Sequence, residues 1–262
     1  MASLAKITHG CTQAILTTGT GDTLRLDADA QSNAQQLAKM ESGSAIRINS
    51  LVTPRGGEFK IVLEDGTEVW LNAESRLKYP ETFGDGDRHV SVEGEAYFKV
   101  AKNPQHPFYV ETAGQRVRVV GTEFNVNAYP EAANVTTTLV KGSIALKPVN
   151  GNVGELMLTP GHQATFDKQA RTATVKAVDT GIMTSWRNGK FVFENQTLGQ
   201  IMLTLSRWYD FEYQFIDKSL AATEFMGSVP RYGEFSEVLQ ILEASGGIRF
   251  RQKGKKIIIA WK

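Results

Sequence analysis

The sequence has few residues that bind metals or form disulfides. It contains one cysteine, Cys11, and four histidines in 262 residues. A single cysteine forms neither an internal disulfide nor a metal site of several thiolates. The histidines are far apart and show neither His-x-His nor HExxH spacing; they are His9, His89, His106 and His162. No Walker loop, Rossmann fingerprint or Gly-x-Ser-x-Gly elbow occurs. We therefore predict no bound metal and no organic cofactor.

An excess of charge of one sign is also lacking, since 29 Lys and Arg face 28 Asp and Glu. Binding to nucleic acid or to an anionic membrane surface typically requires a clustered basic excess, so we predict no nucleic-acid partner. Basic residues do gather near the C-terminus, where they alternate with apolar ones as on the solvent-facing side of two strands; they are Arg249, Arg251, Lys253, Lys255 and Lys256.

Long hydrophobic runs are absent as well. No apolar run approaches the ~18 residues of a membrane-spanning helix. Residues 1–4 do not show the charged and apolar regions of a signal peptide. We expect any membrane anchor to lie on a part of the protein that this sequence does not include.

What the sequence does contain, from about residue 13 to 178, is the pattern of β-strands. Small and apolar residues alternate with polar ones between Ser91 and Lys99, the period of a strand with one buried face. Asp65-Gly66 separates two more alternating segments, as in a tight hairpin. We predict a mainly β domain, a sandwich or solenoid-like fold, over 51–178. An N-terminal hairpin and connector precede it over 1–50, with a short helix or mobile stretch at 28–40.

The pattern changes near Trp186 to two amphipathic helices. The first begins with a capping box formed by Thr197 and Gln200, and the second ends at Gly246-Gly247. A shift of 37 residues places the apolar positions of one helix on those of the other, Leu198 on Phe235 for example. Because strands flank each helix, we predict a small α+β domain of two βαβ units over 188–262, whose helices cover one face of a single sheet.

An ordered set of motifs resembles the FecR-like family. The segments 52–57 (VTPRGG), 63–72 (LEDGTEVWLN), 93–101 (EGEAYFKVA) and 120–126 (VGTEFNV) are similar to its FecR domain. Trp186, the segment 189–191 and the segment 205–209 (LSRWY) resemble the domain that follows in Bacteroidetes-type members. That domain is similar to the short N-terminal (STN) domains of secretins and TonB-dependent receptors.

The resemblance implies the periplasmic portion of a single-pass inner-membrane protein. In that family a short cytoplasmic segment holds an extracytoplasmic-function sigma factor. The periplasmic part receives a signal from the N-terminal signalling domain of a TonB-dependent outer-membrane receptor for iron complexes or other nutrients. The family's cytoplasmic segment and transmembrane helix are not found in this sequence, so we interpret it as part of a longer anti-sigma factor that is not an enzyme.

Two other classes of function stay open. The likeness of the C-terminal repeat to secretin N-domains favours a structural or secretion-assembly protein. A carbohydrate-active or metal-dependent enzyme on a β scaffold would need a catalytic site. Glu93 and Glu95 lie on one strand face as paired carboxylates could, but strict alternation explains them as solvent-facing residues.

Gly121-Thr122 is a candidate self-cleavage site. Some members of the wider family cut themselves at a Gly-Thr bond, where the Thr hydroxyl attacks the preceding carbonyl and the resulting ester hydrolyses. Strained reactive turns are rare, so we favour a simple turn that leads into a strand at 124–128.

Partner contacts are predicted on the C-terminal domain, which we expect to fold alone and to bind the receptor's signalling domain. Helix-end and loop residues are the first candidates: Tyr209, Arg231 and Tyr232. The closing strand 255–261 is the second candidate, as an edge strand to which a partner strand adds. Its predicted contact residues are Ile257, Ile259 and Trp261.

Overall fold

The computed structural model describes residues 6–29, 47–149 and 154–262. The chain forms two compact units. The C-terminal unit contains Ser185–Lys262, Arg55–Gly57 and the residues up to Cys11, and the β-rich unit contains Thr12–Pro54 and Glu58–Thr184. No helix in the described ranges is long and apolar enough to cross a membrane. The connector predicted at 28–40 lies almost wholly outside the described residues, and the domain boundaries at 50/51 and 178/188 stay predictions.

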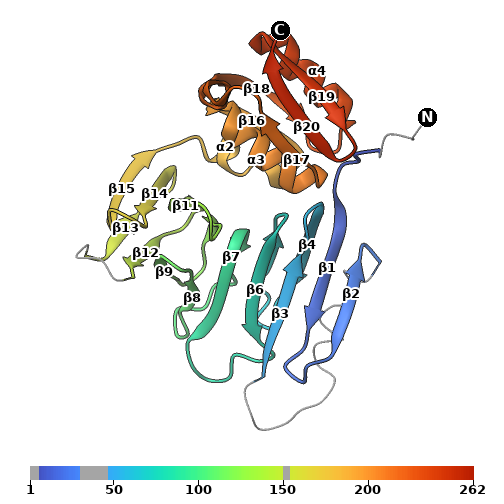
Figure 1. The fold of residues 1–262 in the computed structure, drawn as a ribbon. Coiled ribbons are helices and arrows are strands. Elements are labelled where there is room, and N and C mark those ends of the chain that lie inside the picture. The colour runs from blue at the N-terminus through green and yellow to red at the C-terminus, as the bar shows by residue number, and fades with distance from the viewer. Residues whose placement is uncertain (1–5, 30–46, 150–153) are drawn as a thin grey trace. The chain divides into compact units, whose positions relative to one another are not determined.

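The β-rich unit is built from strands β1 to β15, which Figure 1 shows as arrows coloured from blue to yellow. In chain order they are β1 (Cys11–Thr17), β2 (Thr23–Asp27), β3 (Ile48–Thr53), β4 (Gly57–Val62), β5 (Glu68–Leu71), β6 (Ser75–Pro80), β7 (Arg88–Lys99), β8 (Phe108–Glu111), β9 (Gln115–Val119), β10 (Glu123–Ala128), β11 (Asn134–Lys141), β12 (Ile144–Pro148), β13 (Leu156–Leu158), β14 (His162–Asp167) and β15 (Thr172–Ala177). A short helix, α2 (Thr180–Met183), follows. The prediction of a mainly β domain is confirmed.

Strand β7 is shared by the two layers of this unit. Its first half pairs with β6 and, in parallel, with β8, and its second half pairs with β5 and β10. The change of partners occurs at Gly94, whose φ is +90°. Apolar side chains from both layers form one core cluster, with Leu51 and Phe108 on one side and Val69 and Phe124 on the other. The arrangement is a sandwich whose layers are joined through β7 and also where β4 neighbours β1.

Local sequence signals in both units fold as predicted. The Asp65-Gly66 turn joins β4 to β5, with Gly66 at φ +83°. In the C-terminal unit, Thr197 and Gln200 form the capping box of the first long helix. Gly247, at φ +62°, ends the second. Glycine adopts such positive φ values without the steric cost that a Cβ brings.

The C-terminal unit contains two strand–helix–strand repeats. Its elements are η2 (Ser185–Asn188), β16 (Lys190–Thr197), α3 (Leu198–Tyr209), β17 (Glu212–Phe215), η3 (Lys218–Ala222), β18 (Glu224–Pro230), α4 (Phe235–Gly246), β19 (Ile248–Lys253) and β20 (Lys256–Trp261). The apolar faces of both helices are buried, including Leu198, Ile201, Phe235 and Val238. The α+β prediction is therefore confirmed.

The pairing of these strands differs from the prediction. The first strands of the repeats, β16 and β18, form a two-stranded sheet, and the other strands form a second sheet in the order β17-β20-β19. The expectations of a single sheet and of an edge position for the closing strand are thus wrong. Strand β20 carries apolar residues on both faces, with Ile257 and Ile259 on one and Ile258 on the other. Such a strand is buried best between two neighbours.

The need for glycine at position 94, where β7 changes partners, can be tested by substitution. A Cβ at this position would lie 2.7 Å from the Cα of Ser75, so Gly94→Ala adds a clash to an unfavourable positive φ. We expect Gly94→Ala to lower the free energy of unfolding by about 3 kcal/mol, measured by urea denaturation followed by circular dichroism.

Two glycines in the loop between β6 and β7 provide matched controls. Gly84 has φ +63° and no atom within 4 Å of an added Cβ, whereas Gly86 has neither the strained φ nor a neighbour. Gly84→Ala should cost about 1 kcal/mol, and Gly86→Ala less than about 0.5 kcal/mol. Equal losses at positions 84 and 94 would show that the clash with Ser75 is unimportant.

Candidate partner-binding surface

Arg231 lies in an aromatic cage at the centre of the C-terminal unit. Its side chain is 0% exposed. The guanidinium carbon lies 3.7 Å from the ring centroid of Trp208, 5.2 Å from that of Phe191 and 5.6 Å from that of Trp186. The indole N–H of Trp208 donates to the carbonyl of Arg231 (2.6 Å). A cation over aromatic faces gains an attraction that grows when water is excluded.

Tyr209 fastens the same loop to helix α3. Its hydroxyl donates to the carbonyl of Gly233 at 2.9 Å, and only 2% of the residue is exposed. Burial raises the pKa of Tyr209 to about 12, so the side chain stays neutral at physiological pH. Tyr209 and Arg231 hold the loop 231–233 and cannot reach a partner while the unit is folded, which corrects their assignment as surface contacts.

The closing strand supplies only one exposed contact residue. Ile257 and Ile259 are 0% exposed because β20 lies between two strands. Their assignment to a partner-binding edge is therefore wrong. Trp261 is 50% exposed and Tyr232 is 49% exposed, so these two predicted residues do lie at the surface.

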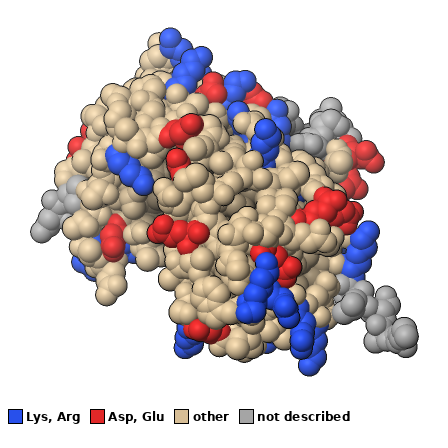
Figure 2. Space-filling model, turned by 90° about the horizontal axis from the view of Figure 1, so that it is seen from above, with Lys and Arg blue, Asp and Glu red and all other residues tan. Residues whose placement is uncertain are grey.

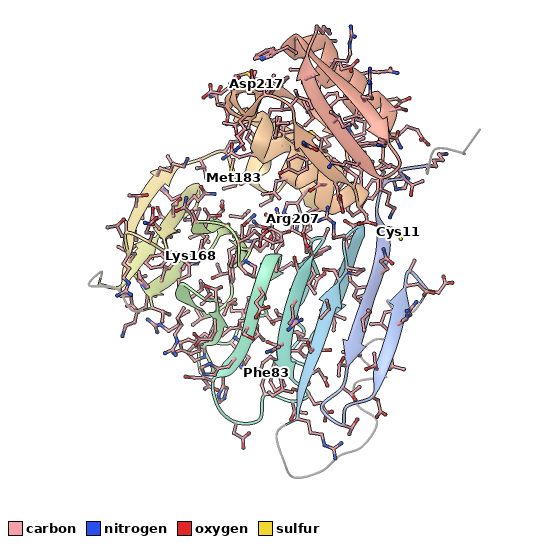
Figure 3. All side chains as sticks on the ribbon, viewed as in Figure 1. Cys11, Phe83, Lys168, Met183, Arg207 and Asp217 are labelled. Atoms are coloured by element: carbon pink, nitrogen blue, oxygen red, sulfur yellow. The ribbon has the colours of Figure 1, made fainter. Side chains whose placement is uncertain are left out.

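Trp261 is held at the surface by a neighbouring carboxylate. Its indole N–H donates to Asp217 Oδ2 at 3.3 Å, and Figure 3 labels Asp217. Hydrogen bonds from Ser219, with that of Trp261 in addition, lower the pKa of the Asp217 carboxyl group. The contact gives an exposed aromatic ring a defined orientation, a property of residues that anchor protein interfaces.

Two segments from the first quarter of the chain complete the C-terminal unit. The backbone N–H of Gly56 donates to the carbonyl of Arg207 (2.7 Å), and the N–H of Cys11 donates to the carbonyl of Gly56 (2.9 Å). Arg55 Nη2 donates to the carbonyls of Ser206 (2.7 Å) and Phe211 (2.8 Å). Cys11 and Arg207 are labelled in Figure 3. The last turn of a helix leaves carbonyls without intrahelical partners, and Arg55 and Gly56 donate to two carbonyls of that turn, those of Ser206 and Arg207.

The N-terminal segment packs closely on the aromatic residues of this unit. A Cβ at Gly10 would lie 2.6 Å from two ring atoms of Trp208, so a side chain at position 10 would prevent the contact. The rings of His9 and Tyr232 meet edge to face, with 5.9 Å between centroids. Sequence patterns did not predict that residues 6–11 belong to the C-terminal unit. The segment 55–57 that they contact was noted in the sequence only as part of a family-like motif.

The Gly121-Thr122 dipeptide lies in the bend between β9 and β10. Thr122 is 2% exposed, and its hydroxyl donates to the carbonyl of Ser143 at 3.0 Å. Gly121 has φ +155°, and a Cβ there would lie 2.9 Å from Lys102 Cα. A close approach of two backbones thus explains the glycine. Self-cleavage at this bond stays the less favoured hypothesis.

The residues considered for metal binding and acid–base chemistry have other partners. Glu95 accepts hydrogen bonds from Asn72 Nδ2 (2.7 Å) and Asn125 Nδ2 (2.9 Å), across neighbouring strands. His89 stacks on Tyr109 with 4.7 Å between ring centroids. Within residues 6–29, 47–149 and 154–262, no three His, Cys, Asp or Glu side chains are grouped as metal ligands.

Comparisons with known proteins match two successive parts of the chain. The sequence model described as FecR protein matches residues 49–145, and the one described as FecR, C-terminal matches residues 190–259. Two crystal structures of a candidate anti-sigma factor from Parabacteroides distasonis ATCC 8503 are similar to this chain. Each is 27% identical with a TM-score of 0.74, and they cover 81% and 82% of this chain and 99% of their own. No curated protein matches the chain.

The aromatic cage predicts that Arg231 stabilises the unit. Arg231→Ala removes the guanidinium from between the rings and leaves a cavity, so we expect a loss of about 3 kcal/mol in the free energy of unfolding. Arg231→Lys should restore only part of it, because an ammonium group is not planar and is more strongly hydrated. Urea denaturation followed by tryptophan fluorescence measures both, since Trp186 and Trp208 line the cage.

Arg249, which is exposed on β19, is the matched control for the loss of an arginine. Arg249→Ala should change the free energy of unfolding by less than about 0.5 kcal/mol. Similar losses at positions 231 and 249 would contradict a structural role for the cage.

Proposed function

The chain belongs to the FecR family, and from this premise we propose that it is the periplasmic sensor region of a transmembrane anti-sigma factor. Models of the two successive FecR domains match it in order, and a candidate anti-sigma factor of known structure is similar to it over both units. A regulatory protein, not an enzyme, fits these matches. The FecR match over residues 49–145 also favours this function over a secretion-assembly role, which only the C-terminal repeat suggested.

In this proposal the C-terminal unit receives the signal. Its partner is the N-terminal signalling domain of a TonB-dependent outer-membrane receptor. A sigma factor is held by a cytoplasmic segment, and an inner-membrane helix joins that segment to the periplasmic part; both belong to sequence not included here. The exposed aromatic residues Tyr232 and Trp261 support a protein-binding role for this unit, because such residues are enriched among the contacts that dominate interfaces.

The packing of the N-terminal segment supports a route by which the signal could be relayed. Residues 6–11, which come next to the membrane helix in the family, pack on helix α3 within the C-terminal unit. Tyr232 contacts both His9 of this segment and Trp208 of the helix. A partner that moves Tyr232 would therefore disturb the segment that leads towards the membrane without acting through the β-rich unit.

The proposal is tested by binding. The chain 1–262 should bind the signalling domain of the receptor encoded beside its gene, measured by isothermal titration calorimetry. Tyr232→Ala and Trp261→Ala should each weaken binding by about tenfold, since truncating an aromatic contact residue typically costs 1–2 kcal/mol or more. The whole chain is used because residues 6–11 and 55–57 complete the C-terminal unit.

Val175 on β15 is a matched control, an apolar residue that is 44% exposed in the β-rich unit. Val175→Ala should leave the affinity unchanged. Normal binding by both aromatic variants, together with weaker binding by Val175→Ala, would contradict the proposal and assign the receptor contact to the β-rich unit.

A further inference from the structure

One face of the β17-β20-β19 sheet is exposed and basic. Strand β20 turns Ile257 and Ile259 to the buried face and the residues between them to the exposed one. On β19 the exposed residues are Arg249, Arg251 and Lys253. Lys256 of β20 lies on the same face, directly opposite Lys253. We call these four basic residues and the sheet residues between them the cationic sheet face. Figure 2 shows several Lys and Arg side chains next to one another on the surface viewed.

Glu212 of β17 lies opposite Lys256 in the register of the sheet. No acidic side chain within the described ranges forms an ion pair with any of the four basic residues. The neighbouring Lys255 differs, since its ammonium group pairs with Asp210. Successive cations on β19 are ~7 Å apart, the repeat of residues on one face of a strand. Like charges directly opposite on neighbouring strands are destabilising. The row of cations on β19 and the Lys253–Lys256 pair are therefore not explained by a gain in the stability of the sheet.

Protection of an exposed edge does not explain it. Lysines on an edge strand discourage pairing with other chains, which suits Lys253 of β19. Lys256, however, belongs to β20, which has strands on both sides. A lysine on a central strand guards no edge, and Lys256 lies between Lys253 on one neighbouring strand and Glu212 on the other.

The cations surround apolar side chains. Ile258 lies at the centre of the face, opposite Arg251 of β19 and Gln214 of β17. Ile216, 65% exposed, follows the end of β17. A small apolar centre with a charged rim, rich in arginine, is the anatomy of a protein interface. Complementary charge on the partner then supplies steering and register.

We infer that the cationic sheet face docks an acidic surface of a folded partner protein. The inference rests on the proposed function where that partner is the receptor's signalling domain. Carboxylates in a row on the partner pair with Arg249, Arg251 and Lys253, and its apolar residues cover Ile258. Single-stranded nucleic acid is a poorer match, because the face has no aromatic ring on which bases could stack.

Charge-reversal variants separate binding from folding. Lys253→Glu replaces a repulsion with an attraction to Lys256, so the melting temperature should rise by about 2 °C at low salt. The same variant should bind the signalling domain about tenfold more weakly, since it places a carboxylate against an acidic surface. Arg251→Glu should weaken binding by about as much, and the binding of the unaltered chain should decrease as salt increases.

Lys176 provides the control. It is exposed on β15, an edge strand of the β-rich unit, so Lys176→Glu makes the same change of charge elsewhere. It should leave the affinity unchanged. Unchanged affinity in Lys253→Glu and Arg251→Glu, with the unaltered chain binding normally, would overturn the inference while the proposed function stood.

A second probe covers the case in which the receptor domain does not bind the unaltered chain, which would count against the proposed function. A fluorescent deca-glutamate peptide, titrated at low salt, should bind the unaltered chain and Lys176→Glu more tightly than Arg251→Glu. Equal binding to all three would overturn the inference. Vesicles of phosphatidylglycerol that sediment the unaltered chain but not Arg251→Glu, while the peptide shows no difference, would assign the face to lipid and also overturn it.

Discussion

At the centre of the C-terminal unit a guanidinium group is removed from water and held 3.7 Å from the ring centroid of Trp208. Burial of a charge is costly unless its surroundings compensate it, and here aromatic faces surround it. The residues that do so come from three elements: Trp186 from η2, Phe191 from β16 and Trp208 from α3. Packing around one side chain thus fixes the helix, the sheet and the loop relative to one another.

The same interaction determines what lies at the surface. Because the carbonyls of Arg231 and Gly233 accept hydrogen bonds from Trp208 and Tyr209, the loop is held against α3, and Tyr232 between them is left half exposed. Tyr232 then contacts the ring of His9. The family motif at 205–209 is therefore explained by packing, and its effect on a partner is indirect, through the position of Tyr232.

Local signals were readable in the sequence because their causes are local. The capping box at Thr197, the Gly247 helix end and the Asp65-Gly66 turn each depend on a few consecutive residues, and each folds as predicted. The order β17-β20-β19 depends on which strands meet, and a strand pattern does not specify its neighbours. Arg231 was assigned to the surface because it lies in the loop before the second helix. Its cage is assembled from residues up to 45 positions away, beyond any local pattern.

Composition concealed the charge distribution for a related reason. A chain with 29 basic and 28 acidic residues suggests no electrostatic specialisation, and alternation at its C-terminus indicates only a solvent-facing strand. The register adds what the pattern lacks, because it places Lys253 opposite Lys256 and puts the latter on a central strand. A local excess of like charge can persist in a nearly neutral protein when its cost in stability is small and the charge serves recognition. Neither the stability of the sheet nor the nearly balanced net charge explains why basic residues gather on the cationic sheet face. Recognition of an acidic partner does explain it.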